Sequence, residues 1–134
     1  MAIAVPANLR AGEPEGGQLA AQPEWGPVVV TYGGTKEIPP DWVAAHRSDV
    51  RVLDVRTAAE LDGELGRLGD SLHIPLDELR ARSAEVPSDK PVVVVCQTGK
   101  RSAMGAAILE KAGFAKVANI AGGMVAWRSL GLPG

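Results

Sequence analysis

The hydrophobic positions beyond Thr35 fall into short apolar runs that alternate with amphipathic stretches. Five of these runs predict strands, because they are rich in β-branched residues and lie between glycine, proline or polar clusters. The expected strands end near Ile38 or cover 50–55, 72–74, 92–95 and 116–120. The run 92–95 is Val-Val-Val-Val, which is typical of a central strand covered on both faces.

Helices are predicted between these strands. Thr57 and Glu60 have the spacing of a capping box, and Pro75 lies where a helix can start. Gly113 suits the position just after a helix end. The expected helices cover 41–47, a short stretch from residue 57, 77–83, 102–112 and 124–130. Strict alternation of strands and helices predicts an α/β fold, with a parallel five-stranded sheet and helices on both faces.

The first part of the chain has a different character. Residues 1–34 mix proline and glycine in a composition typical of a linker, so we expect a tail there and a folded domain over 35–134. Within this tail, the short apolar run 28–30 could add an edge strand or pack on the domain.

Composition and charge add little beyond a globular class. The chain has 134 residues, of which 46% are hydrophobic and 22% charged, and its net charge is -2. This balance indicates neither a nucleic-acid nor a membrane partner. No apolar run approaches the roughly 18 residues that span a bilayer, and residues 1–9 lack the features of a signal peptide. We therefore expect a cytoplasmic protein.

Cys96 is the only cysteine and directly follows the expected central strand. Ligands of parallel α/β sheets bind at the carboxyl ends of strands, which is where this position falls. Cysteine is also a common buried residue, so Cys96 could simply end the strand as a small apolar side chain. The polar, glycine and cationic residues that follow it favour a reactive thiol instead.

The segment after Cys96 has three features that lower a thiol pKa. It leads into a helix N-terminus, whose free N–H groups favour an anion. Gly99 permits a positive φ, so the loop can turn its N–H groups inward, and Lys100 and Arg101 add positive charge. The candidate substrate-binding residues are Gln97, Thr98, Gly99, Lys100, Arg101 and Ser102. Small residues in the following helix, at 102, 103 and 105–107, would let it lie close to the sheet.

Several motifs together resemble the rhodanese family of sulfurtransferases. Cys96 followed by Gly99, Arg101 and Ser102 is similar to the family's active-site loop. Residues 53–57 (Leu-Asp-Val-Arg-Thr), 74–76 (Ile-Pro-Leu) and 121–124 (Ala-Gly-Gly-Met) with Trp127 resemble its other signatures. The resemblance covers about residues 35–134, and the stretch 66–71 (Gly-Arg-Leu-Gly-Asp-Ser) departs from it.

The resemblance implies a sulfurtransferase in which Cys96 carries sulfur as a persulfide, without a metal or cofactor. The donor would be thiosulfate or glutathione persulfide, and the acceptor cyanide, sulfite or glutathione. The loop N–H groups would hold the outer sulfur, and Lys100 would either bind an anionic donor or be a solvated surface residue. We expect Arg101 to pair with Asp54 and fix the loop, and Arg56 to have a similar structural role.

Three alternatives remain at this point. A phosphatase of the same fold would have five residues between cysteine and arginine, whereas this chain has the four residues 97–100. A regulatory module could keep the fold without catalysis. A sulfur-relay module would pass the persulfide to a protein partner.

The N-terminal segment 3–10 (Ile-Ala-Val-Pro-Ala-Asn-Leu-Arg) is similar to the C-terminal tail of persulfide dioxygenases. This resemblance implies a fused or associated dioxygenase that handles glutathione persulfide. The two histidines, His46 and His73, do not have the spacing of metal ligands.

Overall fold

The computed structural model describes residues 25–134, which form a six-stranded sheet in the order β1-β2-β6-β5-β3-β4. The strands are β1 Val29–Val30, β2 Lys36–Ile38, β3 Arg51–Asp54, β4 Leu72–His73, β5 Val92–Val95 and β6 Val117–Ile120. All neighbouring pairs from β2 to β4 are parallel, which confirms the predicted five-stranded parallel sheet.

The sixth strand, β1, joins this sheet antiparallel to β2. It lies within the apolar run 28–30, for which an edge strand was one of the expectations. The amide of Thr31 bonds the carbonyl of Thr35 at 2.8 Å, so the chain reverses over a few residues and can only return antiparallel. Just before β1, Val28 is buried and Trp25 packs edge-to-face on Trp42. Segment 3–10 lies outside the described residues.

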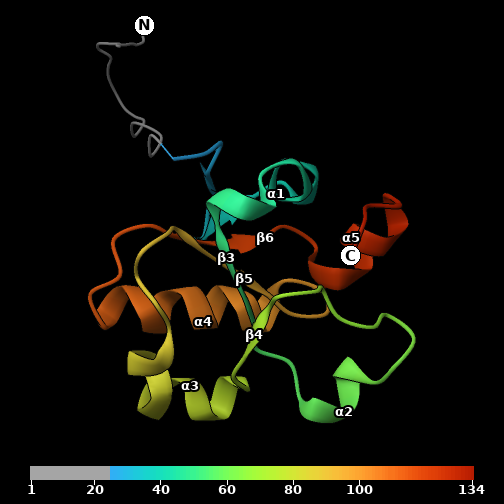
Figure 1. Cartoon of the computed structure of the whole chain (residues 1–134). Helices are drawn as coiled ribbons and strands as arrows, with labels where there is room; N and C mark the ends of the chain where they lie inside the picture. Colours follow the sequence, from blue (N-terminus) through green and yellow to red (C-terminus); the bar gives the residue numbers. More distant parts are fainter. Residues whose placement is uncertain (1–24) are drawn as a thin grey trace, which may run out of the picture.

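The helices form two layers, one on each face of the sheet (Figure 1). They are α1 Pro40–Ala45, α2 Ala58–Leu61, α3 Leu76–Arg82, α4 Lys100–Lys111 and α5 Gly123–Ser129, with short 3-10 turns at Arg47–Asp49 and Ser83–Glu85. A hydrophobic core lies on each face of the sheet. Because side chains alternate along a strand, β5 contributes side chains to both cores. Val93 and Val95 pack with α1 and α5, whereas Val92 and Val94 pack with α3 and α4.

Helix α4 begins at Lys100, two residues before the predicted start. Gly99 has φ 110° and acts as the N-cap, so Lys100 and Arg101 already lie in the first helical turn rather than in a loop. The loop between β5 and α4 is therefore only 96–99, which brings the helix N-terminus close to Cys96. Within residues 25–134, none of the helices has both the length and the apolar character to cross a bilayer.

The small residues of α4 allow its close contact with the sheet. A Cβ on Gly105 would lie 3.1 Å from Val94 Cγ1 and 3.4 Å from Val55 Cγ1. Ser102 and Ala106 are also buried, while Ala107 faces outward. This close contact sets the distance between α4 and the sheet, and so the position of the start of α4 relative to the end of β5.

This contact predicts that Gly105→Leu destabilises the protein by about 2 kcal/mol, because the added atoms overpack a filled interface. The free energy of unfolding in urea measures the effect. Ala107→Leu, on the exposed side of the same helix, serves as the control and should change stability by less than about 0.5 kcal/mol. Equal effects of the two substitutions would contradict the close packing.

Candidate active site

Cys96 lies at the carboxyl end of β5, between β6 and β3, and only 1% of it is exposed. The amide of Gly99 donates a hydrogen bond to its Sγ at 3.0 Å, and the Ser102 Oγ lies 3.4 Å from the same sulfur. The positive φ predicted for Gly99 is confirmed, and this backbone conformation aims its N–H at the sulfur.

Two opposing effects act on the pKa of the Cys96 thiol. Burial raises the pKa, because it disfavours the charged thiolate. Hydrogen bonds from the Ser102 hydroxyl and from the amides of Ser102, Gly99 and Thr98 lower it, and together they outweigh burial. The pKa therefore falls below its ordinary value, and the nucleophilic thiolate is favoured.

The first turn of α5 holds the loop from the opposite side. The amide of Met124 bonds the Cys96 carbonyl at 2.8 Å, and the amide of Val125 bonds the Gln97 carbonyl at 3.0 Å. In a trans peptide the C=O and N–H groups point in opposite directions. Turning the Gln97 carbonyl toward α5 therefore turns the Thr98 N–H toward the sulfur.

Gly123 makes this contact between α5 and the loop possible. A Cβ there would lie 2.4 Å from the Cys96 carbonyl oxygen and 2.5 Å from that of Gln97, and its φ is 61°. Only glycine fits both the space and the backbone conformation.

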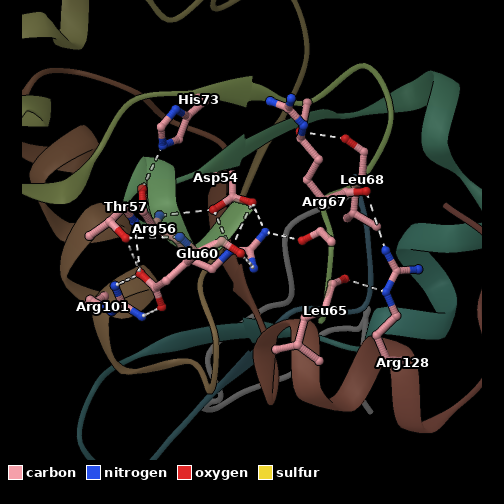
Figure 2. A network of polar contacts seen from close by, with 12 residues as sticks. Asp54, Arg56, Thr57, Glu60, Leu65, Arg67, Leu68, His73, Arg101 and Arg128 are labelled. Atoms are coloured by element: carbon pink, nitrogen blue, oxygen red, sulfur yellow. Dashed lines mark hydrogen bonds and ion pairs between the residues drawn. The ribbon is translucent and has the colours of Figure 1, made fainter. Parts of the chain in front are cut away.

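The prediction that Arg101 pairs with Asp54 is wrong. Arg101 instead makes a two-pronged pair with Glu60, with both N–O distances at 2.7 Å (Figure 2). Asp54 is bonded by Arg56, whose backbone N–H and Nε both lie 3.0 Å from its Oδ1. Arg56 follows Asp54 by two residues, just after β3, and its N–H groups already bind both carboxylate oxygens of Asp54.

Sequence reasoning used Glu60 only as a helix cap and missed this second role. Glu60 does form the capping box with Thr57, and the same carboxylate reaches across to α4. These contacts lower the pKa of Glu60 to about 2, chiefly through its hydrogen bond to Arg101. The pair joins α2 to the first turn of α4, next to Cys96.

The atypical stretch 66–71 is held near the site through its main chain. Arg56 Nη2 donates to the Gly66 carbonyl at 2.7 Å, and Arg128 Nη2 lies 3.4 Å from the Arg67 carbonyl oxygen (Figure 2). Arg128 Nε also donates to the carbonyl of Leu65, just before this stretch, at 2.8 Å. An arginine just after β3 and one on α5 thus hold carbonyl groups, which every residue type provides. This explains how the unusual side chains are accommodated. Arg67 itself is exposed.

A hollow of about 300 Å³ adjoins the loop. Its lining residues are Arg56, Glu60, Gly63, Glu64, Leu65 and Gln97. Of the predicted substrate-binding residues, Gln97, Thr98 and Lys100 are exposed, whereas Ser102 is buried against the sulfur. Within residues 25–134, no three His, Cys, Asp or Glu side chains lie together as a metal site requires.

A parallel α/β sheet with a cysteine of lowered pKa, held by a helix-opening loop, is an arrangement suited to nucleophilic chemistry at sulfur. Residues 39–130 match the sequence profile of the Rhodanese-like domain. The chain therefore belongs to the rhodanese family, as its motifs predicted.

Relatives agree with this assignment. A sulfurtransferase of Allochromatium vinosum is 38% identical over 89 residues, covering 66% of this chain and 81% of the relative. The thiosulfate sulfurtransferase GlpE of Pseudomonas savastanoi is 37% identical, covering 70% and 88%. A rhodanese-related crystal structure from Thermoplasma volcanium superposes with a TM-score of 0.67 at 31% identity, covering 72% and 94%. Together, the family and these relatives support sulfur transfer as the general activity.

The contact at Gly123 predicts that Gly123→Ala reduces the reactivity of Cys96. The added Cβ displaces the loop carbonyls and turns the Thr98 N–H off the sulfur, so the rate of iodoacetamide alkylation at pH 7 should fall about three- to tenfold. Gly131→Ala is the matched control, because Gly131 also has a positive φ but open space around it. A similar loss of rate in the control would show that strain alone is responsible.

The bond between Glu60 and Arg101 predicts a pH-dependent contribution to stability. The Glu60 pKa falls from 4.5 to about 2 on folding, so the contribution is complete above pH 4.5 and is lost as pH falls through about 2. At pH 7, Glu60→Gln should cost about 1 kcal/mol, because the pair is partly solvent-screened. Urea unfolding should show the gap to wild type closing toward pH 2, while Glu64→Gln changes little. A constant gap would contradict this assignment.

Proposed function

We propose that the protein is a sulfurtransferase in which Cys96 accepts sulfane sulfur as a persulfide and passes it to a thiophilic acceptor. The observation that carries the proposal is the hydrogen bond from the Gly99 amide to Cys96 Sγ at 3.0 Å, with the Ser102 Oγ 3.4 Å from the same sulfur. With the neighbouring amides, these contacts lower the pKa of Cys96 and so favour the thiolate. A thiolate that is already formed attacks without a separate general base.

The reaction balances in two displacements. Cys96 thiolate attacks the outer sulfur of thiosulfate, a new S–S bond forms, and sulfite leaves with the electron pair of the broken bond. An acceptor such as cyanide then attacks the outer sulfur of the persulfide. Thiocyanate forms, and Cys96 leaves as the thiolate. With glutathione persulfide as donor, glutathione thiolate takes the place of sulfite, and sulfite or glutathione serves as the acceptor.

The residues of the loop have distinct roles in this proposal. The amides of residues 97–102 stabilise the outer sulfur of the persulfide, as helix N-termini stabilise other anions. Lys100, exposed in the first turn of α4, attracts the anionic donor. The pairs Arg101–Glu60 and Asp54–Arg56 hold α2, β3 and α4 in fixed positions around the loop.

The spacing of the loop favours sulfur over phosphate. Four residues separate Cys96 from Arg101, and the amide of Gly99 already lies 3.0 Å from Sγ. A phosphoryl group needs a wider ring of N–H groups than one sulfur atom does. A phosphatase is therefore the weaker alternative.

A sulfur relay to a protein acceptor is the second candidate. Gln97 and Thr98 are exposed above the buried sulfur, and the hollow beside Gln97 is open. The resemblance of segment 3–10 to persulfide dioxygenases supports glutathione persulfide as the donor and a fused or associated dioxygenase as the source. A cytoplasmic location remains a prediction.

The activity is tested by thiocyanate formation from thiosulfate and cyanide, with Cys96→Ser and with wild type blocked by iodoacetamide. Both should lose all turnover, because each removes the nucleophile. Intact mass after thiosulfate alone should show the gain of one sulfur atom on wild type and none on Cys96→Ser.

The outcomes separate the alternatives. Added sulfur without turnover would favour the relay over small-molecule transfer. If thiosulfate gives no added mass and no turnover, thiosulfate is excluded as the donor. The same mass measurement with glutathione persulfide would then test the other donor. Failure with both donors would overturn the proposal.

A further inference from the structure

Asn119 is a fully buried polar side chain in the middle of the apolar strand β6. Its Nδ2 donates to the Lys36 carbonyl of β2 at 3.1 Å. A carbonyl only accepts hydrogen bonds, so the nitrogen of the amide must face Lys36. The amide oxygen is therefore fixed on the other side, 3.3 Å from Ser102 Oγ.

Ser102 thus lies between two groups that compete for one hydrogen. Its Oγ is 3.3 Å from Asn119 Oδ1 and 3.4 Å from Cys96 Sγ. A serine hydroxyl has one hydrogen and two lone pairs. When Cys96 is a thiol, Ser102 can accept the S–H bond and donate to Asn119. When Cys96 is a thiolate, both neighbours are acceptors, and Ser102 can satisfy only one.

We propose that Asn119 is a positioning residue that holds the Ser102 hydroxyl hydrogen while Cys96 Sγ is neutral and releases it to Sγ when the thiolate forms. The change needs only a rotation about the Cβ–Oγ bond of Ser102, and the heavy atoms stay in place. Asn119 thereby opposes the thiolate, because forming it leaves a buried amide oxygen without this donor.

The meaning of this arrangement for catalysis rests on the proposed function. In a persulfide the charge lies on the outer sulfur, and the inner Sγ is neutral. Ser102 then donates to Asn119. As the acceptor takes the outer sulfur, Sγ regains its charge, and the Ser102 hydrogen turns to it. Asn119 therefore affects the relative stability of the Cys96 persulfide and the free Cys96 thiolate.

Charged groups from the neighbouring elements also face this region. Lys100 and Arg101 belong to α4, and Arg101 interacts favourably with a charge on Cys96. The buried Asp54 ends β3 and the buried Arg56 follows it, and Glu60 of α2 pairs with Arg101. A neutral substitution at Asn119 leaves all these charges unchanged, so it isolates the hydrogen-bond effect.

The test is the pKa of Cys96 in the full chain, measured from the pH dependence of its alkylation rate by iodoacetamide. Asn119→Leu removes the competing acceptor, so the pKa should fall by about half to one unit. Ser102→Ala removes the donor, so the pKa should rise. The double variant should have the same pKa as Ser102→Ala, because Asn119 acts only through Ser102.

Two results would overturn the inference. The first is an unchanged or raised pKa in Asn119→Leu, and the second is an equal shift in the Ser102→Ala background. Circular dichroism checks folding, and Asn119→Val, smaller and suited to a strand, replaces the leucine variant if that one does not fold. Alkylation needs no sulfur donor, so a pKa shift without sulfur transfer would defeat the proposed function alone.

Discussion

The hydrogen bonds donated to Cys96 Sγ are the interaction on which the rest of the site depends. Burial of the cysteine by itself would keep the thiol protonated, and only the Ser102 hydroxyl and the amides around the loop reverse that effect. These donors must point at one atom from a short segment. The positive φ of Gly99 and the early start of α4 at Lys100 meet this requirement locally.

Contacts from distant elements keep the donors in place. Helix α5 binds the loop carbonyls on the side away from the sulfur, and Gly123 lets it approach closely enough. Close packing at Gly105 sets the position of α4 on the sheet. The loop is thus clamped between two helices that belong to opposite layers (Figure 1).

The two arginine–carboxylate pairs differ in their surroundings. Asp54 and Arg56 are almost fully buried, and Arg56 also holds the Gly66 carbonyl. Removing one partner of such a pair leaves an uncompensated buried charge, which strongly destabilises a protein. The pair of Arg101 and Glu60 is partly exposed and joins α2 to α4 beside the site. The first pair supports the sheet edge, and the second orients the start of α4.

The amino-acid sequence by itself determined the alternation of strands and helices, the parallel sheet, the place of Cys96 and the turn at Gly99. These features follow from local periodicity, from the conformational freedom of glycine and from the rule that sites lie at strand ends. The recognised motifs added the family and the expected chemistry.

Only the tertiary structure decided the partner of Arg101, the clamp by α5 and the place of Asn119 beside Ser102. Arg101 and Glu60 are 41 positions apart, and Ser102 and Asn119 are 17 apart. No periodic pattern links them. Asp54 was a reasonable partner for Arg101 until the fold showed Arg56 closer to it. Pairings of this kind depend on how separate segments pack, and local sequence preferences do not encode that choice.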